Sequence, residues 1–218
     1  MASYTRRRIA RLGAVGSAAL FVPRAWGTWR ATPEQVEGPF YPTAEQADTD
    51  LDLTHVAGRA EPATGEVILV RGAVRDVNGA PLAQARVDVW QADHFGRYSH
   101  PRDHNPAPLD PNFQGWGIVR TDTAGNYGFK TVRPGPYPLD ALGGTGWRCR
   151  HVHFKVAHRK AGRLTTQMYF PGDPLIEQDL EIRKAPEALR PLLIADLETD
   201  EATGLPLYRF DLVQGADA

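Results

Sequence analysis

The chain has 218 residues, of which 42% are hydrophobic and 23% are charged, and these values exclude a disordered chain, a collagen and a membrane bundle. This length predicts one domain, or at most two. The 25 Lys and Arg residues balance 26 Asp and Glu residues, so the charge gives no argument for nucleic-acid binding, and the single cysteine, Cys149, excludes an intrachain disulfide framework.

Residues 1–27 are predicted to be an export signal. They contain Arg6, Arg7 and Arg8 ahead of a short apolar stretch at 12–22, and no acidic residue. The stretch is too short to span a bilayer, which needs about 20 apolar residues, so we expect no stable membrane anchor. A basic segment before a short apolar one is typical of a signal peptide, and the run of arginines resembles a twin-arginine signal. We therefore expect a periplasmic or secreted protein. The alternative is an amphipathic helix or basic tail on a cytoplasmic one.

Residues 28–64 are predicted to form an irregular, proline-broken arm, and residues 65–218 one β-rich domain. Residues 67–74 are a β-branched run followed by a hairpin-type turn at 76–79. Residues 85–90 alternate, so that Ala85, Val87 and Val89 share one face. Further strands are expected near 127–131, 151–156, 164–170 and 207–213, with one short helix within 175–200. Short strands at this spacing predict an all-β, antiparallel β-sandwich, and the segments 94–117 and 133–146 are expected to be long loops.

The sharpest local pattern is His151-Val152-His153-Phe154. Alternate residues of a strand point to the same face, so both imidazoles can lie side by side while Val152 and Phe154 enter the core. Two neutral imidazoles suit iron, copper, zinc or nickel. The pattern alone is weak, and two half-exposed polar residues on a sheet face explain it equally well.

Two tyrosines change this balance. Tyr98 follows the alternating strand, and Tyr137 stands between Pro136 and Pro138, where the backbone has little freedom. Each could simply be a packed aromatic ring. As phenolates of pKa about 10, they would need a hard and highly charged cation. With two imidazoles the set suits ferric iron better than zinc or copper, since a site of those metals at the histidines leaves both tyrosines unexplained.

The chain resembles the intradiol ring-cleavage dioxygenases, most closely those of the protocatechuate type. The resemblance rests on a series of motifs that occur in the same order as in the family. They are Val87–Ala92, Gly96–Tyr98, Asp110–Phe113, Thr121–Gly125, Arg133–Pro138, Trp147–Arg148, His151–Phe154 and Gln167–Pro174. The arm segment 37–42 also resembles the family.

The resemblance implies a β-sandwich that holds a non-haem Fe(3+) ion through Tyr98, Tyr137, His151 and His153. It implies cleavage of a catechol-type diol between its two hydroxyls, with O2, to a muconate. Tyr137 would leave the metal and take up a substrate proton. Arg148 would stabilise negative charge on the substrate, and Gln167 would orient the substrate by hydrogen bonding. An oligomer is also implied, as is a second chain in some relatives.

Several alternatives stay open at this stage. Arg148 could be a surface residue and Gln167 a solvent-facing one. If one strand ran through residues 148–153, Cys149 and not Arg148 would point to the same face as His151 and His153. Either the histidine strand begins after Cys149, or the Cys149 thiolate is a candidate metal ligand. Leu139 and Trp116 depart from the family pattern, which leaves the diol open between protocatechuate, catechol and hydroxyquinol. The competing function is a secreted β-sandwich binding module that keeps the metal site without turnover.

Overall fold

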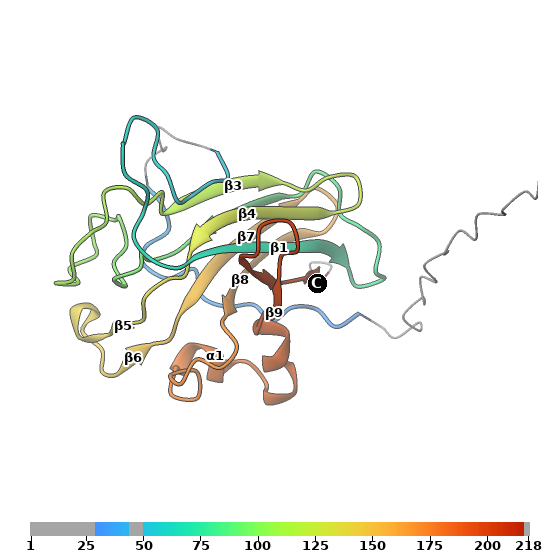
Figure 1. The fold of residues 1–218 in the computed structure, drawn as a ribbon. Helices are drawn as coiled ribbons and strands as arrows, with labels where there is room; N and C mark the ends of the chain where they lie inside the picture. Colours follow the sequence, from blue (N-terminus) through green and yellow to red (C-terminus); the bar gives the residue numbers. More distant parts are fainter. Residues whose placement is uncertain (1–28, 44–49, 216–218) are drawn as a thin grey trace, which may run out of the picture.

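Two β-sheets packed face to face form the fold in the computed structural model, which describes residues 29–43 and 50–215 (Figure 1). The predicted export signal at 1–27 lies outside the described residues and stays a prediction. No helix within the described ranges has the length and apolar character needed to cross a bilayer.

The first sheet is built around β1 (Val67–Asp76). Strand β4 (Asn126–Val132) pairs antiparallel along one side of β1. On the other side lie two parallel partners, β10 (Pro206–Arg209) and then β11 (Leu212–Gln214), and β9 (Asp196–Thr199) adds to β10. The expected sandwich is confirmed, but it is not purely antiparallel, because the last strands of the chain run parallel to the first.

The second sheet has the order β3-β2-β7-β8, and its neighbouring strands are all antiparallel. Its members are β2 (Arg86–Trp90), β3 (Trp116–Arg120), β7 (His151–His158) and β8 (Gly162–Tyr169). Beside it lies a ladder of two short strands, β5 (Tyr137–Pro138) and β6 (Trp147–Arg148). The remaining elements are short helices, α1 (Leu180–Lys184) and the 3-10 turns η1 (Asp140–Leu142) and η2 (Glu187–Leu193).

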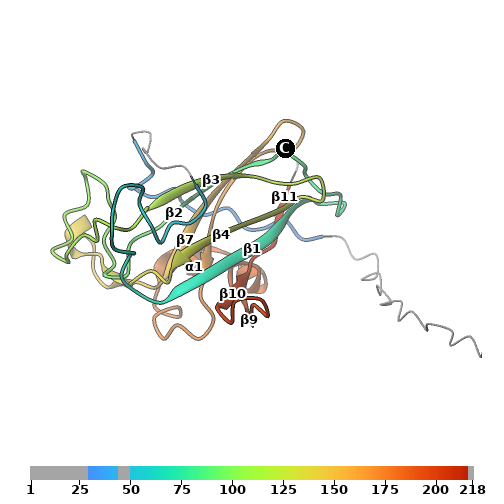
Figure 2. The same cartoon turned by 45° about the horizontal axis from the view of Figure 1, so that its top comes forward.

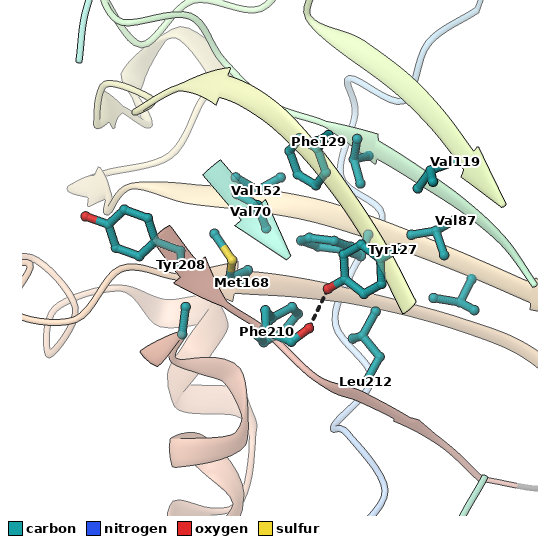
Figure 3. Close-up of a cluster of buried hydrophobic side chains, with 14 of the residues drawn as sticks. Val70, Val87, Val119, Tyr127, Phe129, Val152, Met168, Tyr208, Phe210 and Leu212 are labelled. Carbon is teal, nitrogen blue, oxygen red and sulfur yellow. Dashed lines mark hydrogen bonds between the residues drawn. The ribbon is translucent and has the colours of Figure 1, made fainter. Parts of the chain in front are cut away.

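The core lies between the two sheets, where the predicted alternation is confirmed. Val152 and Phe154 of β7 are fully buried, as are the inward-facing residues of β2. The ring of Phe154 lies 5.2 to 6.1 Å from three aromatic rings of the facing layer, Tyr127, Phe129 and Phe210. Figure 3 shows this cluster, with the Tyr127 hydroxyl donating to the Phe210 carbonyl.

The predicted turn at 76–79 is confirmed, and beyond it the chain folds back on the end of β1, where Arg75 and Pro81 form an antiparallel bridge. Gly79 has φ +83° and its N–H donates to the Asp76 carbonyl over 2.9 Å. Strands β1 and β2 nevertheless belong to different sheets, so this turn carries the chain from one layer to the other. Residues 76–79 determine only the local turn. The sheet that the next strand joins depends on pairings with residues far away in the sequence.

Other boundaries also differ from the sequence prediction. The loop expected at 94–117 ends early because β3 begins at Trp116, and the strand expected at 207–213 is divided at Phe210, whose N–H donates to Arg71. Tyr137, expected in a turn, lies in β5.

The described part of the arm is irregular, as predicted, but it is fixed along its length. It begins beside β11, where the Thr32 N–H donates to Val213, and then crosses the outer face of the second sheet (blue in Figures 1 and 2). The arm bonds successively to β8, β7 and β2 through Gln35–Thr165, Glu37–Lys155 and Tyr41–Asp88. It therefore buries a sheet face that would otherwise meet water.

Replacing Phe154 by Ala tests the core between the sheets. The side chain is fully buried and meets three aromatic rings, so the cavity should cost about 3–5 kcal/mol of unfolding free energy. The measurement is urea unfolding followed by circular dichroism. The control is Leu197→Ala on β9, where the side chain is 55% exposed and little change is expected. Equal losses in both variants would contradict this placement of the core.

Candidate metal centre

Both histidines of β7 lie on its outer face and are almost fully buried, with 2% exposure each. The cross-strand register places His153 between Trp90 of β2 and Gln167 of β8, and Trp116 of β3 lies beyond Trp90. The Trp90 and His153 rings stack at 4.7 Å with 8° between their planes. The predicted side-by-side placement of two imidazoles is confirmed, and the half-exposed alternative is wrong.

The hydrogen bonding of His151 leaves one of its ring nitrogens ready to bind an ion. Its Nδ1 lies 2.7 Å from the Cys149 carbonyl oxygen, which can only accept, so Nδ1 carries the proton. Nε2 then has a free lone pair, and it lies 3.3 Å from the hydroxyl oxygen of Tyr98. The Tyr98 hydroxyl oxygen and the His151 Nε2 lone pair therefore lie together at a position where both could bind one cation.

Tyr98 reaches this position on a loop that is held by buried carboxylates. The Asp103 carboxylate accepts the N–H groups of Tyr98, over 2.6 Å, and Asn105, over 2.8 Å. Asp93 accepts the N–H groups of Phe95 and Arg97 in the same way. A segment with no regular secondary structure thus places its tyrosine through side-chain hydrogen bonds to the backbone.

Tyr137 enters from the other side, on the short strand β5. Its ring centroid lies 5.7 Å from that of Tyr98 and 5.7 Å from that of His151, and the His151 and His153 centroids are 4.9 Å apart. The structure thus brings all four predicted ligand side chains into one buried cluster.

The electrostatics of the cluster suit a cation of high charge. Burial raises the pKa values of Tyr98 and Tyr137, while the nearby Arg148 charge acts in the opposite direction on both. Burial also lowers the pKa values of His151 and His153 well below the usual value. Both imidazoles are therefore neutral donors, and both phenols would keep their protons until a strongly charged ion displaced them. His153 Nδ1 is in addition buried without a hydrogen-bond partner among the described residues. The donor set fits ferric iron.

Zinc and copper fit this cluster less well. In ranges 29–43 and 50–215, no three His, Cys, Asp or Glu side chains gather in a way that could hold a metal ion. The Cys149 thiol does not supply a third ligand for zinc or copper, because it donates to the Asp179 carboxylate over 3.3 Å and packs with Ile182 and Leu193. Burial raises the pKa of this thiol further. Strand β6 ends at Arg148 and β7 begins at His151, so Cys149 and the two histidines do not belong to one continuous strand.

Arg148 and Gln167 lie inside the site and not at the surface. Arg148 pairs with Tyr137 across the β5–β6 ladder and is 6% exposed, and Gln167 is fully buried. The Arg148 Nη2 donates to the Gln167 Oε1 over 2.6 Å. Although burial opposes its charge, the neighbouring Tyr137 and Asp179 raise the pKa of the guanidinium above its ordinary value. A fixed positive charge therefore stands beside the four ring side chains.

The arm closes the site. Gly38, at φ +74°, lies so close to the His153 ring that a methyl group there would be 3.4 Å from Cε1. The Phe40 ring lies 4.6 Å from the Tyr98 ring. A cavity of about 240 Å³ adjoins these rings, and its lining includes Phe40, Pro42, Trp90, Tyr98, His100 and Trp116.

Sequence reasoning missed three contributors to this site. The motif at 37–42 was noted, but its position over the histidines was not, and the anchoring roles of Asp103 and Asp179 were not foreseen. A helix N-cap signal before Leu180 could have indicated a structural role for Asp179. Its pairing with a residue 31 positions away has no local signal.

Comparisons with known proteins show the family to which the chain belongs. The family model described as Dioxygenase matches residues 36–215. The protocatechuate 3,4-dioxygenase beta chain of Burkholderia cepacia is 44% identical over 184 residues, which cover 83% of this chain and 78% of that protein. Catechol 1,2-dioxygenase 2 of Acinetobacter lwoffii is 34% identical over 163 residues, or 70% of this chain but only 56% of the relative.

Solved structures lead to the same class. The 3-chlorocatechol 1,2-dioxygenase of Rhodococcus opacus 1CP superposes with a TM-score of 0.65 at 28% identity, covering 87% of this chain and 75% of that one. The dioxygenase domain of a carbohydrate-binding fusion protein from Streptomyces sp. SirexAA-E gives 0.62 at 26% identity, covering 86% of this chain and all of that domain. Fold and matches together define a β-sandwich dioxygenase. Within that class, the chain belongs to the intradiol ring-cleavage dioxygenases.

Replacing Asp103 by Ala should loosen the loop that carries Tyr98. The change leaves the buried N–H groups of Tyr98 and Asn105 without their acceptor, which should cost about 1–3 kcal/mol of unfolding free energy for each unsatisfied group. Urea unfolding provides the measurement. The matched control is Asp122→Ala, which removes a similar pair of N–H acceptors from an exposed turn, where water can replace them. A loss no larger than the control's would show that Asp103 does not hold the loop.

Proposed function

We propose that the protein is a non-haem Fe(3+) dioxygenase that cleaves a catechol-type diol between its two hydroxyls, using O2, to give a muconate. The observation that carries the proposal is the meeting of two buried tyrosines and two buried histidines beside a guanidinium and an aromatic cavity. Family membership supports the same reaction class.

The ion would be held by Tyr98, Tyr137, His151 and His153. Bound iron(III) supplies the redox chemistry that makes a coordinated diol reactive toward O2. The chain contributes the negative charge of the two tyrosines, the fixed His151 tautomer and a site from which the arm excludes water.

The protein groups then handle the protons and the charge of the diol. A catechol must lose protons to bind a cation, and the Tyr137 oxygen is the group that takes one up. Arg148 uses Nε and Nη2 for internal hydrogen bonds, and its Nη1 is bonded to none of the described residues. That nitrogen faces the negative charge that develops on the diol and stabilises it. Gln167 fixes the guanidinium in this orientation.

The cavity favours an uncharged diol. The residues that line it include no Lys, Arg, Asp or Glu, and the aromatic rings of Phe40, Trp90 and Trp116 form part of its walls. A ring carboxylate would lose hydration there without gaining a cationic partner. Plain or alkyl-substituted catechols are therefore the proposed substrates, ahead of protocatechuate. Assembly into an oligomer, with or without a second chain, and export through the segment at 1–27 also stay part of the proposal.

The metal assignment is tested by Tyr98→Phe and His153→Ala. Each variant removes one of four protein ligands, so iron content should fall and the visible tyrosinate-to-iron absorption band should weaken. Metal analysis and absorption spectra of the purified proteins measure both. The control is Tyr208→Phe, a buried tyrosine of β10 outside the cluster, which should keep its colour. Unchanged iron and colour in both site variants would remove the assignment.

The role of Arg148 is tested by Arg148→Ala. The resting colour should persist because no ligand is lost, while ring cleavage should slow by roughly 10²–10³ in kcat, as is typical when one preorganised stabilising group is removed. Oxygen uptake and product spectra are the measurements. Full activity would mean that the guanidinium does not act on the diol.

The substrate is tested with catechol, 4-methylcatechol, protocatechuate and hydroxyquinol. We expect kcat/KM to be highest for the uncharged catechols and the product spectrum to be that of a muconate. A semialdehyde product would place cleavage outside the diol. A preference for protocatechuate would show that the cavity does not hold the ring substituent. If iron-loaded protein took up no oxygen with any diol, the binding-module function would be favoured.

A further inference from the structure

Asp179 is a fully buried carboxylate at the first turn of α1, and its two oxygens have separate partners. Oδ1 accepts the Glu181 N–H over 2.8 Å and so caps the helix. Oδ2 accepts from Arg148 Nε over 2.9 Å and from the Cys149 N–H over 3.0 Å. One oxygen thus serves the local fold, and the other reaches into the active site.

Arg148 needs such a partner because its own backbone constrains it little. It lies on β6, a strand of only two residues, and its side chain is 7% exposed. Asp179 holds Nε, and Gln167 holds Nη2 over 2.6 Å. Gln167 is itself fixed, since its Nε2 donates to the Val36 carbonyl of the arm over 3.0 Å. The guanidinium is therefore held on two sides, and its plane and the direction of Nη1 are set.

We propose that Asp179 is a positioning residue for ring cleavage, which acts by aiming the Arg148 guanidinium at the bound diol. The inference rests on the proposed function, because only there does Arg148 meet a substrate. A buried guanidinium without a counter-charge would turn toward water or draw water into the site. Asp179 supplies that charge from outside the metal cluster, through an arginine whose planar geometry transmits orientation.

The substitution Asp179→Asn separates the two roles of this residue. Asparagine keeps an oxygen for the Glu181 N–H, but it presents an NH2 group to Arg148 and removes the counter-charge. Iron content and the visible band should stay at wild-type levels. We expect kcat to fall about 10- to 100-fold, since small misplacements of a reacting group have effects of this order. KM should change less than kcat.

A second buried aspartate provides a matched control. Asp173 is 3% exposed, its Oδ1 accepts the Leu175 N–H over 3.0 Å, and its Oδ2 accepts from Arg150 Nη1 over 3.3 Å. It therefore repeats the arrangement with an arginine whose side chain is 30% exposed. Asp173→Asn should lower the melting temperature comparably and leave kcat near the wild-type value. An equal fall in kcat in Asp173→Asn and Asp179→Asn would show that Asp179 has only a structural role.

The decisive measurement combines Asp179→Asn with Arg148→Ala. If Asp179 acts through the guanidinium, the double variant should have the kcat of Arg148→Ala alone. A further fall in the double variant, or an unchanged kcat in the single variant, would overturn the proposal.

A metal-free measurement separates this proposal from the function on which it rests. In protein stripped of metal, the double variant should lose less melting temperature than the sum of its two single variants, because removing Arg148 removes the charge left unpaired by Asp179→Asn. An additive loss would contradict the buried pair itself. Coupling without any oxygen uptake by the wild-type protein would overturn the proposed function, and the positioning role with it, while leaving the pair in place.

Discussion

Burial on both faces of the second sheet is the constraint on which the rest of the structure depends. One face packs into the core, as in any sandwich, but the outer face is also dry, with Trp90, His153 and Gln167 each at most 2% exposed. Polar groups in such a place need partners, since an unpaired buried donor or charge is costly. The arm over this face, Asp93, Asp103 and the Arg148–Asp179 pair supply such partners, whereas His153 Nδ1 has none among the described residues.

The constraint also explains how irregular segments can place chemical groups accurately. Tyr98 and the arm residue Gly38 belong to no strand or helix, yet both meet the histidines of β7. Their positions follow from hydrogen bonds to buried partners. Rigid β7 supplies two groups at fixed spacing, and the loops are fitted around it, which is the usual division between scaffold and functional loops.

Sequence reasoning was accurate where the determining interaction is local. The alternation of Val152, His153 and Phe154 fixes which side chains face the core, and no distant residue changes that. The grouping of Tyr98 and Tyr137 with the histidines was suggested by their chemistry and made specific by the family resemblance, because residues 39 positions apart carry no spacing signal for contact. The turn at 76–79 was recognised from its own residues, whereas the sheet that the next strand joins depends on pairings with distant residues. Asp179 was missed because its importance depends on an arginine far away in the sequence.

The position of β1 has a consequence for how the chain can fold. The first strand of the domain, at residues 67–76, takes its parallel partners from residues 206–214, close to the C-terminus. The first sheet therefore cannot be completed until residue 214 has left the ribosome, and until then one edge of β1 is open to incorrect pairing. Long-range pairings of this kind slow folding and prolong exposure of strand edges. Removal of Leu212–Gln214 would leave the end of β1, at Val74–Asp76, without its parallel partner.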